Sequence, residues 1–551
     1  MTILKASLLT AALVAVTGCA SLPSPSPNGP LAEAPAGAFR GIRDGGVRIW
    51  RGIRYAEAPT GDLRWKPPVA MADAIGEVTA TQFGDACVQP EARADLTKIY
   101  FDDPGPLSED CLSLNVWSQE GIGNAPVLVW IHGGALVSGS SSLGMYNGAH
   151  LARKGAVVVS INYRLGVLGF LAHPALSAES PDGVSGNYGL LDQVAALRWV
   201  QRNIAAFGGD PGNVTIAGES AGGLSVMYLL ASPEARGLFD KAIAQSAYMV
   251  SVPGLSETLN GQPPAEAVGM AVQQAVGAAD LRAMRILPAE ELVANAPSAG
   301  FYPQATVDGN VLPHQITDIF DEGQQAAVPL LVGFNDGETR SLRSLVPPVP
   351  KSTDEYENAI ERVYGSEATR FLKLYPASDL QESILAAPRD ALYGWTAQRM
   401  AEAQRRVGST AYFYLFDHGY PAADQAGLHA FHASEIPYMF GTIHETAPAW
   451  PAIPQTADER AFSDAMMSYW LSFARTGIPR AEGGPDWPTF DESKRYMLFA
   501  DVPAVARDPL GDRFALYEET VCRRRADGSV PWNWNVGIAA PPMSPAKEQC
   551  R

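Results

Sequence analysis

The 551-residue chain has few charged residues and lacks any excess of positive charge. Charged residues make up 18% of the sequence, against about 25% in an average globular protein. The net charge is −18, and because so acidic a chain is repelled by phosphate backbones, we expect no nucleic-acid partner. The sequence also lacks repeats and heptads, which excludes solenoids and coiled coils. With 46% hydrophobic residues, it can bury a large core, which excludes a disordered chain.

The N-terminus carries only a short hydrophobic run, residues 6–16, which Lys5 precedes. A run of this length cannot cross about 30 Å of hydrocarbon as a helix, but it is typical of a signal peptide. It ends in Val-Thr-Gly-Cys at residues 16–19, which resembles the lipobox of bacterial lipoproteins. We therefore expect residues 1–18 to be a signal peptide and Cys19 to carry a lipid. An ordinary secretory signal is the alternative.

Residues 19–37 follow as an expected Pro- and Ser-rich tether. On this interpretation the protein is exported and contacts a membrane only through the lipid on Cys19. It would then be anchored at the outer membrane or at the periplasmic face of a bacterial membrane. Without the lipid, it would be periplasmic or secreted.

Cysteine is scarce, with five residues in the chain. Once Cys19 is assigned to the lipid, an even number remains for an oxidising compartment, namely Cys87, Cys111, Cys522 and Cys550. Since the members of each neighbouring pair lie close in sequence, we expect the bridges 87–111 and 522–550. Each closed loop stabilises the fold by about 3 kcal/mol in the chain-entropy model. Free thiols are the alternative, and no C-x-x-C spacing indicates a metal site.

Short apolar runs alternate with longer segments of helical pattern. The runs lie at residues 127–131, 156–159, 214–217 and 329–332, and residues 191–205 show a helical pattern between two of them. Continuous apolar runs are typical of strands that are buried on both faces of a parallel sheet. The alternation therefore predicts an α/β fold with a mostly parallel central sheet and helices on both faces.

Two further stretches, at about 255–320 and about 345–410, have a helical pattern without strong strand signals. We expect them to be helical cap insertions around a site. The predicted organisation is a single catalytic domain over residues 38–522, followed by a C-terminal tail over residues 523–551 that a disulfide ties down.

The motif Gly218-Glu219-Ser220-Ala221-Gly222 follows the predicted strand 214–217 and precedes a helical pattern. In this context G-x-S-x-G forms a sharp strand-to-helix turn that exposes the serine hydroxyl as a nucleophile. The N-terminus of the following helix favours negative charge that develops nearby. Ser220 is therefore the candidate nucleophile.

A serine nucleophile requires N–H donors for the oxyanion of its tetrahedral intermediate. The segment His132-Gly133-Gly134-Ala135 directly follows the strand 127–131, where esterases and lipases carry their oxyanion motif. We expect the backbone amides of Gly134, Ala135 and Ala221 to donate. A glycine-rich turn with no further role is the alternative. His132 lies inside this motif and is expected to be structural.

The general base has to be one of eight histidines, five of which follow Ser220. His432 and His429 are the two candidates in one loop-like segment, residues 427–436. Their H-x-x-H spacing also occurs in metal sites, but no third ligand accompanies it at the usual spacing, so no metal is expected.

The orienting acid should follow a strand between the serine and the histidine. Asp336 and Glu338 both follow the predicted strand 329–332, and either carboxylate could hold an imidazole in the required tautomer. The residues alone leave both candidates open.

Sequence blocks around these motifs resemble the type B carboxylesterase family, which also contains the cholinesterases and the bacterial para-nitrobenzyl esterases. The similarity runs from about residue 38 to about residue 520. The blocks are Trp50–Ala56, Glu109–Val116, Asn187–Gln193 and Phe207–Pro211.

The resemblance implies an α/β-hydrolase fold with helical cap insertions and a reaction without cofactor or metal. It implies Glu338 as the acid and His432, which heads the block H-x-x-E-I, as the base. It also implies a disulfide between Cys87 and Cys111. The chain departs from the family at Arg54, where Pro is common, and at Ala135, where many members have Gly. The tail over residues 523–551 matches no part of the family pattern.

The expected function is hydrolysis of a small-molecule carboxylic ester through an acyl-enzyme on Ser220. Two alternatives use the same scaffold. One is a catalytically silent binding module, which the presence of all three triad residues disfavours. The other is an acyltransferase that uses the same triad with an alcohol or amine as acceptor.

Overall fold

The computed structural model describes residues 29–90, 95–533 and 536–550. The expected signal peptide, residues 1–18, and Cys19 lie outside these described residues. Part of the expected tether is a strand: β1 (Leu31–Ala34) pairs antiparallel with β2 (Gly37–Arg40), and Ala32 is buried. Residues 31–34 and residue 37, which fall within the expected tether, are therefore paired in a sheet.

Within the described residues, eleven strands form the central sheet, and its middle is parallel from β10 to β15. Both ends of this sheet are closed by antiparallel pairs. In spatial order the strands are β16 (Ala504–Arg507), β15 (Arg495–Phe499), β14 (Ala411–Phe416), β13 (Leu330–Asn335), β12 (Lys241–Gln245), β11 (Gly209–Glu219), β9 (Ala125–Ile131), β10 (Val157–Ile161), β8 (Ser113–Gln119), β4 (Val47–Arg54) and β3 (Ile42–Asp44).

Two small sheets accompany it in the same described ranges. The first consists of β1, β2 and β5 (Glu77–Thr79), and the second of β6 (Ala86–Cys87) and β7 (Leu107–Ser108).

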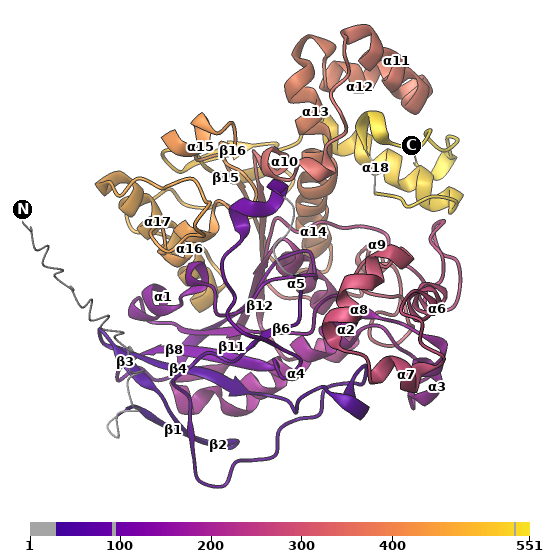
Figure 1. Cartoon of the computed structure of the whole chain (residues 1–551). Helices are drawn as coiled ribbons and strands as arrows, with labels where there is room; N and C mark the ends of the chain where they lie inside the picture. The colour runs from indigo at the N-terminus through magenta and orange to yellow at the C-terminus, as the bar shows by residue number, and fades with distance from the viewer. Residues whose placement is uncertain (1–28, 91–94, 534–535, 551) are drawn as a thin grey trace, which may run out of the picture.

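The helices surround the central sheet and extend from its loops (Figure 1). Those of the first half are α1 (Ala149–Arg153), α2 (Gly166–Phe170), α3 (Pro174–Glu179), α4 (Tyr188–Asn203), α5 (Ala221–Ala231), α6 (Ala265–Ala275), α7 (Leu281–Arg285), α8 (Ala289–Asn295) and α9 (Ile316–Asp321). Those of the second half are α10 (Glu338–Ser341), α11 (Thr353–Tyr364), α12 (Ala368–Leu374), α13 (Leu380–Arg389), α14 (Trp395–Arg406), α15 (Pro421–Gln425), α16 (Ile436–Phe440), α17 (Ala457–Thr476) and α18 (Asp512–Asp527).

Side chains along the central strands alternate between two separate hydrophobic cores. In β9, Val127 and Val129 pack in the cluster that contains residues of α4, α5 and α14, whereas Leu128 and Trp130 pack in the cluster that contains residues of α1 and α17. Successive residues of a strand point to opposite faces. Both faces are therefore covered, which explains why the sequence of this strand is apolar without interruption.

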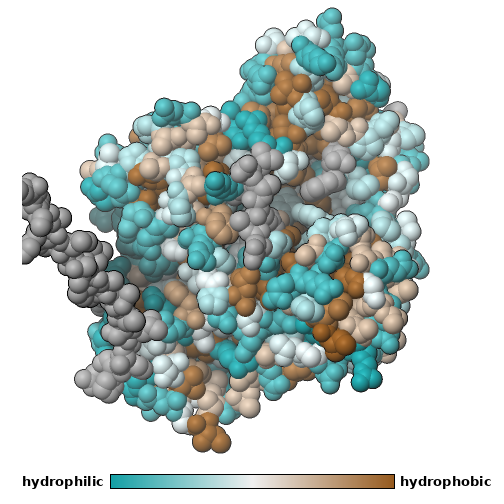
Figure 2. Space-filling view, in the orientation of Figure 1, coloured by the Kyte–Doolittle hydropathy of each residue, from teal (hydrophilic) through white to brown (hydrophobic). Residues whose placement is uncertain are grey.

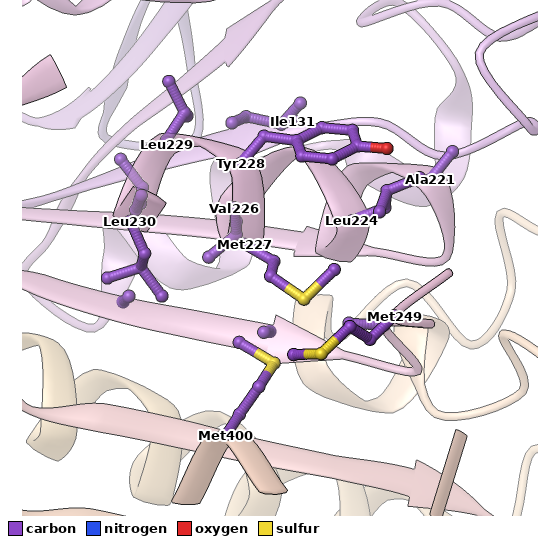
Figure 3. Packing of buried hydrophobic residues seen from close by; sticks show 14 of the residues in the cluster. Ile131, Ala221, Leu224, Val226, Met227, Tyr228, Leu229, Leu230, Met249 and Met400 are labelled. Carbon is purple, nitrogen blue, oxygen red and sulfur yellow. The ribbon is translucent and has the colours of Figure 1, made fainter. Parts of the chain in front are cut away.

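The helix α5 lies at the centre of the larger core. Figure 3 shows its side chains together with Met249 and Met400, which belong to the same core cluster as Met227. All eleven residues of α5 are buried. Because helix positions on every side contact other parts of the protein, the start of α5 is held firmly against the ends of β11 and β12.

The two predicted helical insertions are confirmed. Residues 255–320 contain α6 to α9, and residues 345–410 contain α11 to α14. Figure 1 shows α11 to α13 as a lobe above the sheet and α6 to α8 as a second group of helices beside it. The face seen in Figure 2 is mostly hydrophilic, with apolar side chains gathered on the upper lobe. Among the described residues, the helices do not combine the length and apolar character that crossing a bilayer requires.

The C-terminal tail packs onto the second insertion. The boundary expected after residue 522 falls inside α18, which continues to Asp527. Beyond it, Trp532 is buried with its ring 6.2 Å from that of Trp395, and Asn533 Nδ2 donates to the carbonyl oxygen of Met249 at 2.8 Å. The tail thus completes the core around α14.

Both cysteine pairs expected from the sequence are joined in the structure, Cys87 to Cys111 and Cys522 to Cys550. They close loops whose ends are separated by 24 and 28 positions. Disulfides form and persist in oxidising compartments, so this pair of bridges is consistent with an extracytoplasmic location.

Candidate active site

Ser220 occupies a strained turn between β11 and α5. Its backbone has φ 56° and ψ −122°, which is unusual for a residue with a side chain and costs about 1–3 kcal/mol. The turn is held because the Ser220 amide donates to the carbonyl oxygen of Gln245 at 3.0 Å, and its own carbonyl accepts from Leu224 at 2.8 Å. A Cβ at Gly222 would overlap the carbonyl oxygen of Ile131. The small residue two positions after Ser220 therefore lets the helix start close to β9.

Glu338 and His432 are brought together from two loops. Glu338 begins α10, shortly after β13 ends, and His432 lies in the loop before α16. The Gly337 amide donates to the carbonyl oxygen of Ala430 at 2.8 Å, which aligns the two loops. Both side chains are buried, and Nδ1 of His432 is hydrogen-bonded to Oε2 of Glu338. The other carboxylate oxygen of Glu338 accepts from the Asn335 amide at 2.8 Å, so the acid is fixed on both sides.

Ser220 and His432 both line a cavity of about 520 Å³ at the carboxyl ends of the parallel strands. Ligand sites of α/β sheets lie at this edge, and pockets for small molecules have volumes of about 300–1,000 Å³. The charged residues Lys98 and Asp102 also line the cavity. Most of its remaining walls are apolar, and the apolar lining residues include Phe101, Leu143, Met145, Tyr146, Leu342 and Ile436.

The loop after β9 forms the wall of the cavity beside Ser220. Its residues Gly134, Ala135 and Leu136 have φ of 106°, 57° and 58°, so the backbone is left-handed over three consecutive positions. Gly133 lies against the serine, because a Cβ built on it would be 3.2 Å from the Ser220 Cβ. Both Gly134 and Ala135 line the cavity. The loop therefore presents glycine-rich backbone at the candidate nucleophile.

Ala221, the third expected donor, is the first residue of α5. Its methyl group is buried in the large core, and Figure 3 shows it at the start of the helix. The amides of a first helical turn have no carbonyl partner within the helix. The amide of Ala221 follows Ser220 directly and is thus free of the helical hydrogen-bond ladder.

Two further buried carboxylates surround His432. Oε1 of Glu219 lies 3.0 Å from Nε2 of His432. Glu435 accepts hydrogen bonds from Nδ2 of Asn335 at 2.6 Å and from Nε2 of Gln245 at 2.9 Å. These two glutamates are not among the expected site residues, although they occupy the second position of G-x-S-x-G and the last position of H-x-x-E.

These carboxylates determine the protonation of the site. Burial alone would lower the pKa of His432, but the charges of Glu219 and Glu338 outweigh it and raise this pKa to about 9. Burial raises the pKa of Glu219 well above its usual range, and it also raises the pKa of Glu435. Since Glu219 and His432 are in contact, they titrate as a coupled pair.

Two tyrosines fix the outer side of His432. The hydroxyl of Tyr100 donates to Oγ of Ser341 at 2.6 Å and lies 3.1 Å from the carbonyl oxygen of His432. Tyr100 belongs to the loop that the Cys87–Cys111 bridge closes. The ring of Tyr393 lies 5.4 Å from that of His432 and comes from a π-helical turn, Asp390–Gly394, between α13 and α14. Such π-turns are frequent at functional sites.

The competing candidates lie elsewhere. Both ring nitrogens of His429 are engaged, with Asp417 at 2.9 Å and with Asp424 at 2.8 Å. Asp336 pairs with Arg389 at 2.8 Å.

His132 is buried and stacked on Tyr163, and burial lowers the pKa of His132 to about 4. Its ring is therefore neutral at physiological pH. Its packing agrees with the structural position expected for it from the sequence.

Comparison with known proteins identifies the family to which the chain belongs. A sequence model of the carboxylesterase family matches residues 28–515. The chain belongs to the carboxylesterase family. It is a type B member and a carboxylic-ester hydrolase with the α/β-hydrolase fold.

Relatives of this carboxylesterase include a fumonisin B1 esterase from Sphingopyxis macrogoltabida, which is 36% identical over 84% of this chain and 85% of that protein. A para-nitrobenzyl esterase from Bacillus subtilis is 34% identical over 87% of this chain and 96% of that protein. A solved structure of a para-nitrobenzyl esterase superposes with a TM-score of 0.76 at 32% identity, covering 88% of this chain and 98% of that one. The carboxylesterase from Geobacillus stearothermophilus superposes with a TM-score of 0.70 at 34% identity, covering 88% and 99%.

Proposed function

We propose that this carboxylesterase hydrolyses esters through an acyl-enzyme on Ser220, with His432 as general base and Glu338 as the orienting acid. The observation that carries the proposal is the hydrogen bond between Glu338 and Nδ1 of His432, beside the cavity that Ser220 lines. A carboxylate at Nδ1 keeps the proton on that nitrogen, so Nε2 is unprotonated and can accept a proton.

In the acylation step, the Ser220 oxygen attacks the ester carbonyl carbon while His432 takes the hydroxyl proton. The tetrahedral intermediate collapses, the bond to the alcohol oxygen breaks, and His432 delivers its proton to that oxygen. Water then attacks the acyl-enzyme with His432 again as base. The carboxylic acid leaves, and Ser220 is regenerated.

The oxyanion of both intermediates is assigned to the amides of Gly134, Ala135 and Ala221. Support comes from the left-handed backbone of the glycine-rich loop and from the position of Ala221 in the first turn of α5. Donors of this kind contribute about 3–4 kcal/mol each to transition-state stabilisation. The helix N-terminus adds a favourable field for the negative charge.

The substrate class is a small-molecule ester with bulky apolar groups. The cavity volume of about 520 Å³ and its aromatic and aliphatic walls support this choice. Two relatives are a fumonisin B1 esterase and a para-nitrobenzyl esterase. No cofactor or metal takes part in the proposed reaction.

We also propose that the protein is exported, with residues 1–18 removed as a signal peptide and Cys19 lipidated. The remaining chain would form one esterase domain that includes β1 and α18, with the segment after α18 tied to it by the Cys522–Cys550 disulfide. The two disulfides support an oxidising compartment. Mass spectrometry of the membrane fraction tests the anchor, because a diacylglycerol on Cys19 is expected and an unmodified Cys19 would contradict it.

The test of catalysis is a series of p-nitrophenyl esters, from acetyl to decanoyl, run on the wild type and on Ser220→Ala. We expect Ser220→Ala to lower kcat by roughly 10⁵-fold or more. Ser138→Ala is the matched control, since Ser138 lines the same cavity, and it should retain most of the activity. Near-wild-type turnover in Ser220→Ala would contradict the assignment.

The same series separates the two alternatives. A folded wild-type protein that cleaves none of the esters would favour the binding module. An added alcohol that receives the acyl group faster than water does would favour the acyltransferase.

A further inference from the structure

Outside the active site, the structure brings together two histidines and a glutamate from distant parts of the chain. His150 lies on α1, and His444 and Glu445 lie in the loop after α16. One ligand atom from each of the three residues lies within 4.8 Å of the others. No sequence motif could indicate this group, because nearly 300 residues separate its two parts.

The spacing of these atoms suits a transition-metal ion. Nε2 of His150 lies 3.9 Å from Oε1 of Glu445, and Nε2 of His444 lies 3.4 Å from the same oxygen. With bonds of about 2.1 Å, a tetrahedral zinc ion places its ligand atoms about 3.4 Å apart. Two imidazoles and one carboxylate, with a further position for water, are also a donor set that zinc uses in proteins.

The group has the outer contacts that hold metal ligands in place. Glu445 keeps Oε1 for the two histidines, while its Oε2 accepts a hydrogen bond from Nδ2 of Asn147 at 3.0 Å. Asn147 itself is fixed, because its Oδ1 accepts from the amide of Ala149 at the start of α1.

The group joins two segments that line the substrate cavity. Met145 and Tyr146, in the short 3₁₀ turn Gly144–Tyr146 before α1, line that cavity, and so does Ile436 at the start of α16. The segments already touch, since Oγ1 of Thr442 donates to the carbonyl oxygen of Met145 at 2.9 Å. An ion held between α1 and the loop after α16 would fasten these two walls to each other.

We propose that His150, His444 and Glu445 bind one divalent transition-metal ion of the zinc class and that this ion clamps two walls of the substrate cavity. Imidazole nitrogens with a single carboxylate select Zn²⁺ and its neighbours over Mg²⁺ or Ca²⁺. The ion stands outside the cavity and takes no part in the ester chemistry. This inference is independent of the role assigned to Ser220.

The test is direct binding of Zn²⁺ to the untagged protein, measured by competition with a chromogenic chelator. We expect one Zn²⁺ per chain in the wild type and no saturable binding of Mg²⁺. His444→Ala and Glu445→Gln should abolish this binding. Asn147→Ala, which removes only the outer hydrogen bond, should weaken it by about 10–100-fold. His314→Ala is the matched control, since it removes an exposed histidine elsewhere, and it should bind as the wild type does.

A second measurement distinguishes a clamp from surface binding. Hydrogen exchange of residues 144–150 and 441–445 should slow when Zn²⁺ is added to the wild type and should not change in His444→Ala. Zn²⁺ binding that persists in both His444→Ala and Glu445→Gln would overturn the site. Binding that is lost in those variants but leaves exchange of these segments unchanged in the wild type would overturn the clamp.

Discussion

Nε2 of His432 lies 3.0 Å from Oε1 of Glu219, the residue that directly precedes the candidate nucleophile. The proposed base thus has a carboxylate at each ring nitrogen, Glu338 on one side and Glu219 on the other. The first suits orientation of the ring, and the second stabilises the imidazolium that forms when the base accepts a proton.

Glu338→Gln should lower kcat by roughly 10⁴-fold, because an amide holds the imidazole in the wrong tautomer while preserving its position. The measurement is kcat on a short p-nitrophenyl ester. Asp336→Asn is the control, since Asp336 pairs with Arg389 and not with His432. A larger loss in the control than in Glu338→Gln would assign the acid to Asp336.

Glu219→Gln should shift the pH profile of kcat/KM to lower pH. The base has to be neutral, so activity rises as pH passes the pKa of His432, which its neighbouring carboxylates raise to about 9. Removing the charge of Glu219 lowers this pKa, and the rise then occurs earlier. Glu492→Gln, at an exposed position, should leave the profile unchanged. A midpoint that does not move in Glu219→Gln would show that Glu219 carries no charge beside His432.

Removing the Cys87–Cys111 bridge should affect both stability and catalysis. The loss of a loop closure of this length lowers the free energy of unfolding by about 3 kcal/mol. This loop also carries Tyr100, which is hydrogen-bonded beside His432, so kcat/KM should fall as well. Urea unfolding and ester kinetics of Cys87→Ser/Cys111→Ser measure the two effects. The matched double variant Cys522→Ser/Cys550→Ser should lose similar stability and keep its kcat/KM, and equal kinetic losses would contradict the role of the loop.

His429 should stabilise the fold only at lower pH. Its hydrogen bonds to Asp417 and Asp424 raise its pKa to about 9, above the usual value of 6.5. The contribution is therefore complete below about pH 6.5 and is lost as pH rises through about 9. His429→Gln should lower Tm at about pH 6 and have little effect at about pH 10. An equal decrease in Tm at both pH values would mean that the charged form of His429 is not the stabilising one.

Much of the fold follows from local patterns. The uninterrupted apolar runs at 127–131, 156–159, 214–217 and 329–332 correspond to β9, β10, β11 and β13. A strand buried on both faces has to be apolar throughout, so its sequence is distinctive on its own. The turn at Ser220 was predictable for a related reason, because only small residues fit where a helix starts against a neighbouring strand.

Other features depend on partners far away in the sequence. Glu219 and Glu435 are ionisable residues in a core, and nothing near Glu435 in the sequence shows that Asn335 and Gln245 supply hydrogen bonds to it. The choice between Asp336 and Glu338 also depended on family resemblance, since both follow the same strand. The docking of Trp532 beside Trp395 could not be anticipated, because the tail has no counterpart in the family pattern.

The backbone at Ser220 sets activity and stability against each other. Glycine adopts a φ of 56° without the strain that a side chain creates there. The most stabilising exchange at this position is therefore one that abolishes the proposed chemistry. Laboratory evolution of this enzyme for heat resistance alone would therefore favour glycine at position 220, and the selected protein would be inactive. A selection for heat resistance should therefore score ester cleavage in every round.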